Sequence, residues 1–168
     1  MTNKLTQPTQ IDDLLLYRLR RLVATGGATV IRMCEGQLGI TWREWRVMAS
    51  LRPGVSLLSS ELAVHAQLDR ARTSRAITSL VSKKLVLRQL VPHDQRKATV
   101  TLTDKGREMY ESFFPVVVQL NQFLLDGLDE SVINQLDQAL SHAQVQADQL
   151  KDKAGQAKAN RGRRTVKT

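Results

Sequence analysis

Apolar residues recur at every third or fourth position in three long stretches of the chain, which is the spacing of helices with one buried face. The first stretch contains Gly26-Gly27 and the second contains Pro115, and each of these features predicts a bend. Asp126-Gly127 separates the second stretch from the third. We therefore expect three long helices, over residues 11–35, 104–125 and 129–150.

Shorter helices are predicted between the first two long ones. Thr41 is a natural N-cap for a helix over residues 42–52. Ser59 or Ser60 can cap a short helix after it, and Asp69 can cap a longer one. A short helix, a tight turn and a longer helix form a helix-turn-helix pattern.

The longer helix of this pair has two chemically different sides and extends to about Lys84. Its helical spacing turns four apolar residues inward: Ala76, Ile77, Leu80 and Val81. The opposite side is polar and basic, and it carries Arg70, Arg72, Ser74, Arg75 and Thr78. In a helix-turn-helix protein, the second helix with such an outer side is the one that enters the major groove of DNA.

Residues 86–102 change from helical to alternating hydrophobicity, which is typical of β-strands. Val86, Arg88 and Leu90 alternate, and the same period returns from Ala98 to Leu102. A polar turn, residues 92–97, separates the two runs, and Thr103 can cap the long helix that follows. The predicted fold is therefore mainly α with a small β wing, a winged helix-turn-helix.

The long helices are more apolar than a monomer of this size needs. A second copy of the chain would cover these apolar faces, so we expect a homodimer joined through residues 11–35 and 104–150. The DNA-binding part then covers residues 55–103, within a domain over 11–150 that follows an N-terminal arm of residues 1–10. Residues 151–168 have almost no apolar side chains and are expected to form a basic, disordered tail.

Composition excludes several classes of protein. Of 168 residues 42% are hydrophobic, which is enough for a core, but 4% are aromatic, which argues against a stacking surface for sugars. One cysteine, Cys34, excludes an internal disulfide, and the three scattered histidines form no metal-binding pair. No catalytic constellation and no phosphate-binding glycine loop can be assembled, so we expect neither an enzyme nor a cofactor. The N-terminus lacks a secretory pattern and no apolar run suits a membrane span, which favours a cytoplasmic protein.

Charge is segregated along the chain, whose formal net charge is +9. Residues 61–107 carry ten basic and four acidic side chains, whereas residues 108–150 carry seven acidic and no basic ones. The tail from residue 151 is basic again. A mixed solvated surface would not segregate in this way, so one region is expected to face a polyanion such as double-stranded DNA.

Several of these segments together resemble the MarR (multiple antibiotic resistance) family of bacterial transcription regulators. The resemblance covers roughly residues 11–150 and is carried by Leu62-Ala63, Ser74-Arg75, the Asp94-x-Arg96 motif and the run from Leu102 to Arg107. It implies a homodimer on a palindromic operator, usually a repressor that a small ligand releases. Lys84 departs from the family, which often has glycine there, so we expect this lysine to adopt a left-handed or distorted backbone.

The residues expected at the DNA come from the longer helix and the wing. The guanidinium group of arginine can donate two hydrogen bonds to one guanine, and the hydroxyls of threonine and serine can bond phosphates or bases. Arg96 is expected in the minor groove with Asp94 holding its guanidinium, as the family suggests, although an ordinary turn salt bridge would look the same. Thr73 could equally belong to the core. The full set is Arg70, Arg72, Thr73, Ser74, Arg75, Thr78, Arg88, Asp94, Arg96 and Lys97.

An effector site is expected in the first two helices, where the family places ligands between the dimer helices and the winged domain. Tryptophan and arginine together can bind a small aromatic carboxylate by stacking and ion pairing. The REWRV run at residues 43–47 resembles family members that regulate aromatic-acid catabolism, hydroxycinnamate types among them. The candidates are Arg18, Arg32, Trp42, Trp45 and Arg46; the alternative is that Trp45 is core and the arginines are surface.

Two other functions remain open from the sequence. Some relatives sense peroxides through a reactive cysteine, although the acidic neighbour Glu35 would not lower the pKa of the Cys34 thiol. A basic architectural protein, which compacts DNA without sequence choice, would share the charge but would not need the wing.

Overall fold

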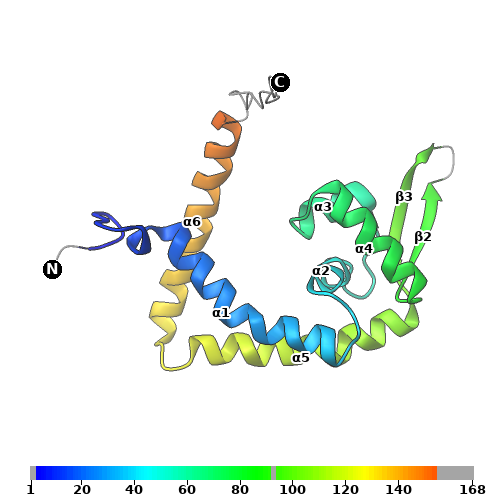
Figure 1. The fold of residues 1–168 in the computed structure, drawn as a ribbon, viewed down its shortest axis with the longest axis horizontal. Helices are drawn as coiled ribbons and strands as arrows, with labels where there is room; N and C mark the ends of the chain where they lie inside the picture. The colour runs from blue at the N-terminus through cyan, green and yellow to red at the C-terminus, as the bar shows by residue number, and fades with distance from the viewer. Residues whose placement is uncertain (1–2, 92–93, 155–168) are drawn as a thin grey trace, which may run out of the picture. The chain divides into compact units, whose positions relative to one another are not determined.

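The computed structural model describes residues 3–91 and 94–154, with the side chains of residues 94–96 and 154 left out. The chain divides into two compact units, one up to Leu124 and one from Leu125 onward. The first unit holds most helices and the sheet (Figure 1). As predicted, the fold is mainly helical with a small antiparallel sheet.

The first long helix begins later than predicted. Residues Ile11–Asp13 form a short 3-10 turn, and α1 runs over Leu15–Gly36. Leu14 between them has an extended backbone, with ψ at 133°. The buried carboxylate of Asp13 accepts hydrogen bonds from the backbone N–H and the hydroxyl of Thr9, at 3.1 and 3.0 Å. These bonds favour a turn over a helical start, which the apolar periodicity alone could not show.

Helix α2 (Trp42–Ser50) precedes the helix-turn-helix, which consists of α3 (Ser59–His65) and α4 (Arg70–Ser82). Thr41 caps α2 and Asp69 caps α4, as predicted. The prediction that serine caps α3 is wrong, because Ser59 lies inside the helix and donates its hydroxyl to Ala98 O at 3.2 Å. The carboxylate of Glu61 caps the N-terminus of α3 instead, because it accepts a hydrogen bond from the N–H of Leu58 at 2.7 Å.

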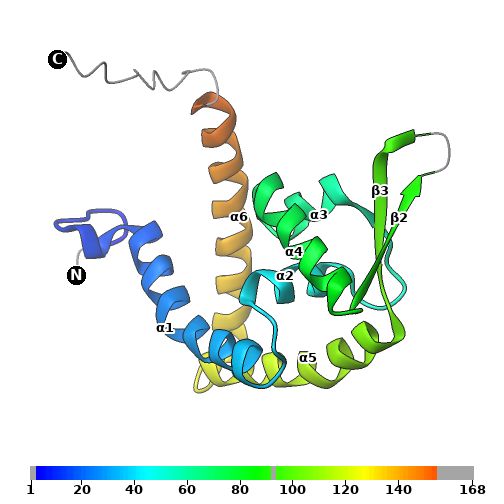
Figure 2. The same cartoon turned by 45° about the vertical axis from the view of Figure 1, so that its right-hand side comes forward.

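The sheet has three strands rather than two. Strand β1 (Leu57–Leu58) pairs with β3 (Asp94–Leu102), which also pairs with β2 (Val86–Val91), both antiparallel. The β1 strand has two residues, too few for its alternation to be seen in the sequence. β3 begins at Asp94, so residues 94–97, which we predicted as turn, are strand. In Figures 1 and 2, β2 and β3 run side by side and form the wing.

The core of the first unit lies where α1, α2, α4, the sheet and the start of α5 (Asp104–Leu125) meet. Met48, Leu51, Leu62 and Leu80 are fully buried in it. Val81, predicted to face inward, is 39% exposed, because it lies one position beyond the buried stripe of α4.

The junction from α4 into the wing is close-packed. Lys84 has φ of +59°, the left-handed conformation expected at a position where the resembled family often has glycine. Thr103 donates its hydroxyl to Lys84 O at 2.8 Å and accepts from Gly106 N–H at 3.0 Å, so it caps α5 as predicted. A Cβ on Gly106 would lie 2.0 Å from Leu85 O, so only glycine allows this approach of α5 to the wing.

The long helices run on through the residues where bends were predicted. α1 is continuous through Gly26-Gly27, and α5 is continuous through Pro115. Gly127, with φ of +78°, follows the end of α5, as predicted. In the second unit, α6 covers Glu130–Ala154 and so extends four residues into the segment predicted as a disordered tail; residues 155–168 lie outside the described part of the chain.

Candidate nucleic-acid interface

The two sides of α4 differ as the sequence predicted. Ala76, Ile77 and Leu80 are buried against the core. Five predicted contact residues are exposed on the remaining surface of the helix: Arg70, Arg72, Ser74, Arg75 and Thr78. The helix therefore rests on an apolar side and presents three guanidinium groups and two hydroxyls to its surroundings.

Thr73 does not belong to this surface. Its side chain is 1% exposed, and its hydroxyl donates to Asp69 O within the same helix at 2.9 Å. The expectation of a DNA contact from Thr73 is therefore corrected. Its position in the sequence, three residues before Ala76, places it on the buried stripe.

One hollow beside α4 gathers residues that are distant in sequence. It has a volume of about 390 Å³ and lies among the start of α3, α4 and β2. Arg70, Ser74 and Thr78 line it from α4 and Arg88 lines it from β2, so four predicted residues share one site. Ser59 and Ser60, which were not predicted as site residues, also line this hollow, because β1 brings the start of α3 next to β3.

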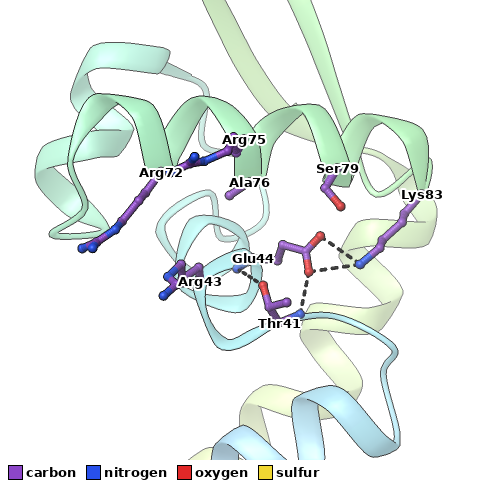
Figure 3. Close-up of a pocket in the computed structure, with 8 residues that line it drawn as sticks. All are labelled: Thr41, Arg43, Glu44, Arg72, Arg75, Ala76, Ser79 and Lys83. Carbon is purple, nitrogen blue, oxygen red and sulfur yellow. Dashed lines mark hydrogen bonds and ion pairs between the residues drawn. The ribbon is translucent and has the colours of Figure 1, made fainter.

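A second hollow lies on the other side of α4, against α2, with a volume of about 500 Å³ (Figure 3). Arg72 and Arg75 line it from α4, and Arg43 lines it from α2. Arg43 was not predicted as a site residue. No motif marks it in the sequence, since its role depends on the packing of α2 against α4.

The wall of this second hollow is held by a buried carboxylate. Glu44 is 3% exposed and accepts from Lys83 Nζ at 2.8 and 3.0 Å and from Thr41 N–H at 2.5 Å. Burial raises the pKa of Glu44, but hydrogen bonds from Lys83, Ser79 and Thr41 outweigh burial and hold the pKa below its ordinary value. The carboxylate is therefore ionised and neutralised by Lys83 at neutral pH.

The wing is described mainly through its backbone. Val91 pairs with Asp94 across the hairpin, after a shift in register between Leu90 and Val91. Lys97 is exposed on β3. The side chains of Asp94 and Arg96 lie outside the described part of the structure, so their predicted pairing stays a prediction.

The predicted effector residues divide into three groups. Trp42, Trp45 and Arg46 share a hollow of about 550 Å³ with Arg52 and His65. Arg18 lines a different hollow on α1, and Arg32 is exposed, with its guanidinium 3.5 Å from Thr29 Oγ1. The structure therefore does not bring the five residues into one site.

Trp45 is mainly a core residue. It is 3% exposed, packs edge-on against Phe113 at 4.7 Å between ring centroids and stacks on Tyr110 at 5.9 Å. These contacts join α2 to α5. Its indole therefore offers little accessible surface to the hollow, and Trp42, which is half-buried, is the more accessible ring.

Cys34 is unsuited to fast thiol chemistry. It is fully buried, and burial, with a smaller contribution from the charge of Glu35, raises the pKa of its thiol to about 11. Nearly all of the thiol is protonated at neutral pH, which leaves little thiolate for an oxidant to attack.

The described part of the chain also bears on metals and membranes. Among residues 3–91 and 94–154, no group of three or more His, Cys, Asp or Glu side chains could hold a metal ion. Within the same ranges no helix combines the length and the apolar character needed to cross a bilayer.

Comparison with known proteins identifies the helix-turn-helix and the wing. Residues 38–97 match the family model described as MarR family. This segment of the chain is therefore similar to the MarR family. The chain is also 33% identical over 78 residues to the uncharacterized HTH-type transcriptional regulator YdgJ of Bacillus subtilis, covering 46% of this chain and 48% of that protein. The chain spans about half the length of the curated relatives it matches, 48% and 57%.

The MarR fold extends beyond the matched segment. A MarR/EmrR family regulator from Acinetobacter sp. ADP1 superposes with a TM-score of 0.75 at 24% identity, covering 83% of this chain and 99% of that one. Bordetella bronchiseptica BpsR, whose structure addresses regulation of DNA binding by 6-hydroxynicotinic acid, superposes with a TM-score of 0.65 at 25% identity, over 76% of this chain and 98% of its own. The winged-helix fold class predicted from the sequence is confirmed.

Proposed function

We propose that the protein is a sequence-specific DNA-binding transcription regulator that acts as a ligand-released repressor. The observation that carries the proposal is the surface of α4, where Arg70, Arg72 and Arg75 are exposed beside Ser74 and Thr78. In the major groove, the guanidinium group of arginine recognises guanine through two hydrogen bonds. Each good contact contributes about 1–3 kcal/mol of discrimination against the wrong base. The wing formed by β2 and β3 adds a second contact with the duplex.

The comparisons support this proposal. YdgJ is named as an HTH-type transcriptional regulator, and BpsR as a protein whose DNA binding is regulated by a small molecule. That small molecule is 6-hydroxynicotinic acid, an aromatic acid. An aromatic acid suits the hollow that Trp42 and Arg46 line. Such a regulator works in the compartment that holds the chromosome, so the cytoplasmic location expected from the sequence is part of the proposal.

A homodimer on a palindromic operator completes the proposal. Large apolar side chains stand exposed on the long helices, including Leu16 (73%) and Val23 (69%) on α1 and Phe123 (77%) on α5. On α6, Val132, Leu136 and Leu140 repeat every fourth residue and are also exposed. A second copy would cover these residues and would place two α4 helices in successive major grooves, about 34 Å apart. Sedimentation equilibrium that shows a monomer at micromolar concentration would contradict this part.

The effector is proposed to be a small aromatic carboxylate in the hollow at Trp42. Trp42 offers a ring for stacking, and Arg46 and Arg52 offer guanidinium groups for the carboxylate. The guanidinium of Arg46 donates to Gln67 O at 3.2 Å, in the turn before α4, so a ligand on Arg46 has a route to that helix. A panel of aromatic acids that alters neither DNA affinity nor melting temperature would remove this part of the proposal.

The decisive experiment compares a specific with a scrambled duplex. Fluorescence anisotropy on DNA upstream of the gene, across a salt series, should show a preference that survives about 0.15–0.2 M salt. Equal and steeply salt-dependent binding to both duplexes would favour the architectural alternative. The buried Cys34 makes oxidation a poor switch, and we expect Cys34→Ser to leave DNA affinity unchanged after peroxide treatment.

A further inference from the structure

We propose that the hollow between α2 and α4 holds a phosphate group of the DNA backbone, and that Arg43 is the residue α2 contributes to it. The proposal rests on the proposed DNA-binding function and adds a site to it. Arg43, Arg72, Arg75 and Lys83 line this hollow, and Glu44 is the one carboxylate among its lining residues. Cationic side chains from α2 and α4 therefore line the same hollow (Figure 3).

The charges of the hollow do not cancel. Lys83 neutralises Glu44 through the contacts at 2.8 and 3.0 Å. The Nε atom of Arg72 lies 3.3 Å from Oδ2 of Asp69, but both side chains are 55% exposed, so water screens this pair. Arg43 and Arg75 have no ion pair or hydrogen bond from their guanidinium groups among the described residues. One uncompensated guanidinium group therefore remains on each helix.

The arrangement fits a backbone phosphate better than a base. Guanidinium groups bind phosphate oxygens through paired, charge-assisted hydrogen bonds. In Figure 3, Arg43 and Arg72 lie toward one end of the hollow, and Lys83 lies at the other end with the carboxylate of Glu44. The side chains of Arg43, Arg72 and Arg75 are exposed, so a duplex reaches them without rearrangement of the protein.

A phosphate at this position would set the depth and register of α4. Contacts with phosphates position a protein on DNA, whereas contacts with base edges select the sequence. Arg43 is in the first turn of α2. The Glu44–Lys83 pair fixes this turn to α4, so the position of Arg43 relative to α4 is fixed as well. Arg43 then supplies affinity without sequence preference, and the residues of α4 supply the preference.

The test is Arg43→Ala in the full chain, with anisotropy titrations on the specific and the scrambled duplex. Removal of one phosphate contact should lower the slope of log affinity against log salt by about 0.9. The ratio of variant to wild-type Kd should therefore shrink about 3.5-fold between about 50 and about 200 mM salt, by the same factor on both duplexes. Arg43→Lys should keep most of the slope, since it keeps the charge. Lys105→Ala is the control, because Lys105 is an exposed cation on α5 that does not line this hollow.

The outcomes separate this inference from the function on which it rests. If the unaltered protein binds neither duplex, the proposed function fails and the phosphate site fails with it. If the protein binds and Arg43→Ala matches Lys105→Ala in slope, the phosphate site alone is overturned. Inorganic phosphate, compared with chloride at equal ionic strength, tests the source of the anion. Competition by free phosphate in the wild type, with an unchanged slope in Arg43→Ala, would assign the hollow to a free anion and overturn the DNA contact.

Discussion

The ammonium nitrogen of Lys83 lies 2.8 Å from Oε1 of Glu44, and this pair joins the end of α4 to the first turn of α2. Lys83 also donates to Gly39 O at 2.9 Å, in the loop between α1 and α2. Glu44 in turn completes the capping box of α2 with Thr41. One lysine therefore ties α4 to two other parts of the chain.

Lys83→Met should destabilise the fold, because it leaves the buried carboxylate of Glu44 without its cation. We expect a loss of about 1–3 kcal/mol in the free energy of unfolding. The loss should stay below that of a fully buried pair, since the Lys83 side chain is 34% exposed. Urea unfolding measures it, with Lys105→Met on the exposed surface of α5 as the control. Equal stability of the two variants would show that the pair contributes nothing.

Acid should remove the contribution of Glu44 to stability. Its pKa in the folded protein lies below the ordinary value of 4.5, so the unfolded chain takes up the proton first as the pH falls. The stabilisation is therefore complete above about pH 4.5 and is lost as the pH falls through the lower, folded pKa. Urea unfolding at neutral pH and at several acidic values should show a smaller acid loss for Glu44→Gln than for the wild type. Parallel profiles for the two proteins would contradict the prediction.

Gly106→Ala should be among the most damaging small substitutions in the chain. The added Cβ would meet the backbone oxygen of Leu85 at 2.0 Å, and backbone cannot yield as a flexible side chain can. Overpacking of this kind costs about 1–3 kcal/mol. Gly27→Ala is the matched substitution, since nothing lies within 4 Å of its Cβ and alanine favours α1 by about 0.5–1 kcal/mol. Thermal melts should therefore shift in opposite directions, and a shared direction would contradict the packing argument.

The sequence predicted those features that depend on local chemistry. Thr41, Asp69 and Thr103 cap their helices as predicted, because a cap needs only a side-chain acceptor beside free backbone N–H groups. The left-handed backbone of Lys84 was expected from the resemblance, because the family often has glycine at this position. These features require no knowledge of how distant segments pack.

Features that depend on packing between distant segments could not be predicted. β1 exists because Leu57 and Leu58 meet β3, about forty residues later. Arg43 reaches the surface of α4 because Glu44, its neighbour, binds Lys83. Arg18 and Arg32 were grouped with Trp42 by residue type and by the place of ligands in the resembled family, and the fold places them elsewhere. Residue type therefore predicted which side chains suit a ligand, but not which of them share a site.

Thr73 and Arg75 offer the sharpest test of the surface of α4, since they lie two residues apart and differ in exposure. Arg75→Ala should weaken binding to the specific duplex by about 1–3 kcal/mol and relax its preference over the scrambled one. Thr73→Val should leave DNA affinity unchanged, because the hydroxyl is buried and donates to Asp69 O at the N-terminal end of its own helix.

Anisotropy at one salt concentration measures both effects, and circular dichroism verifies that each variant is folded. Arg96→Ala extends the test to the wing, where the same loss of about 1–3 kcal/mol is expected from the sequence. Weaker binding by Thr73→Val with unchanged stability would mean that α4 turns a different side toward DNA. If Arg75→Ala and Arg96→Ala both bind DNA with wild-type affinity, the interface lies outside α4 and the wing.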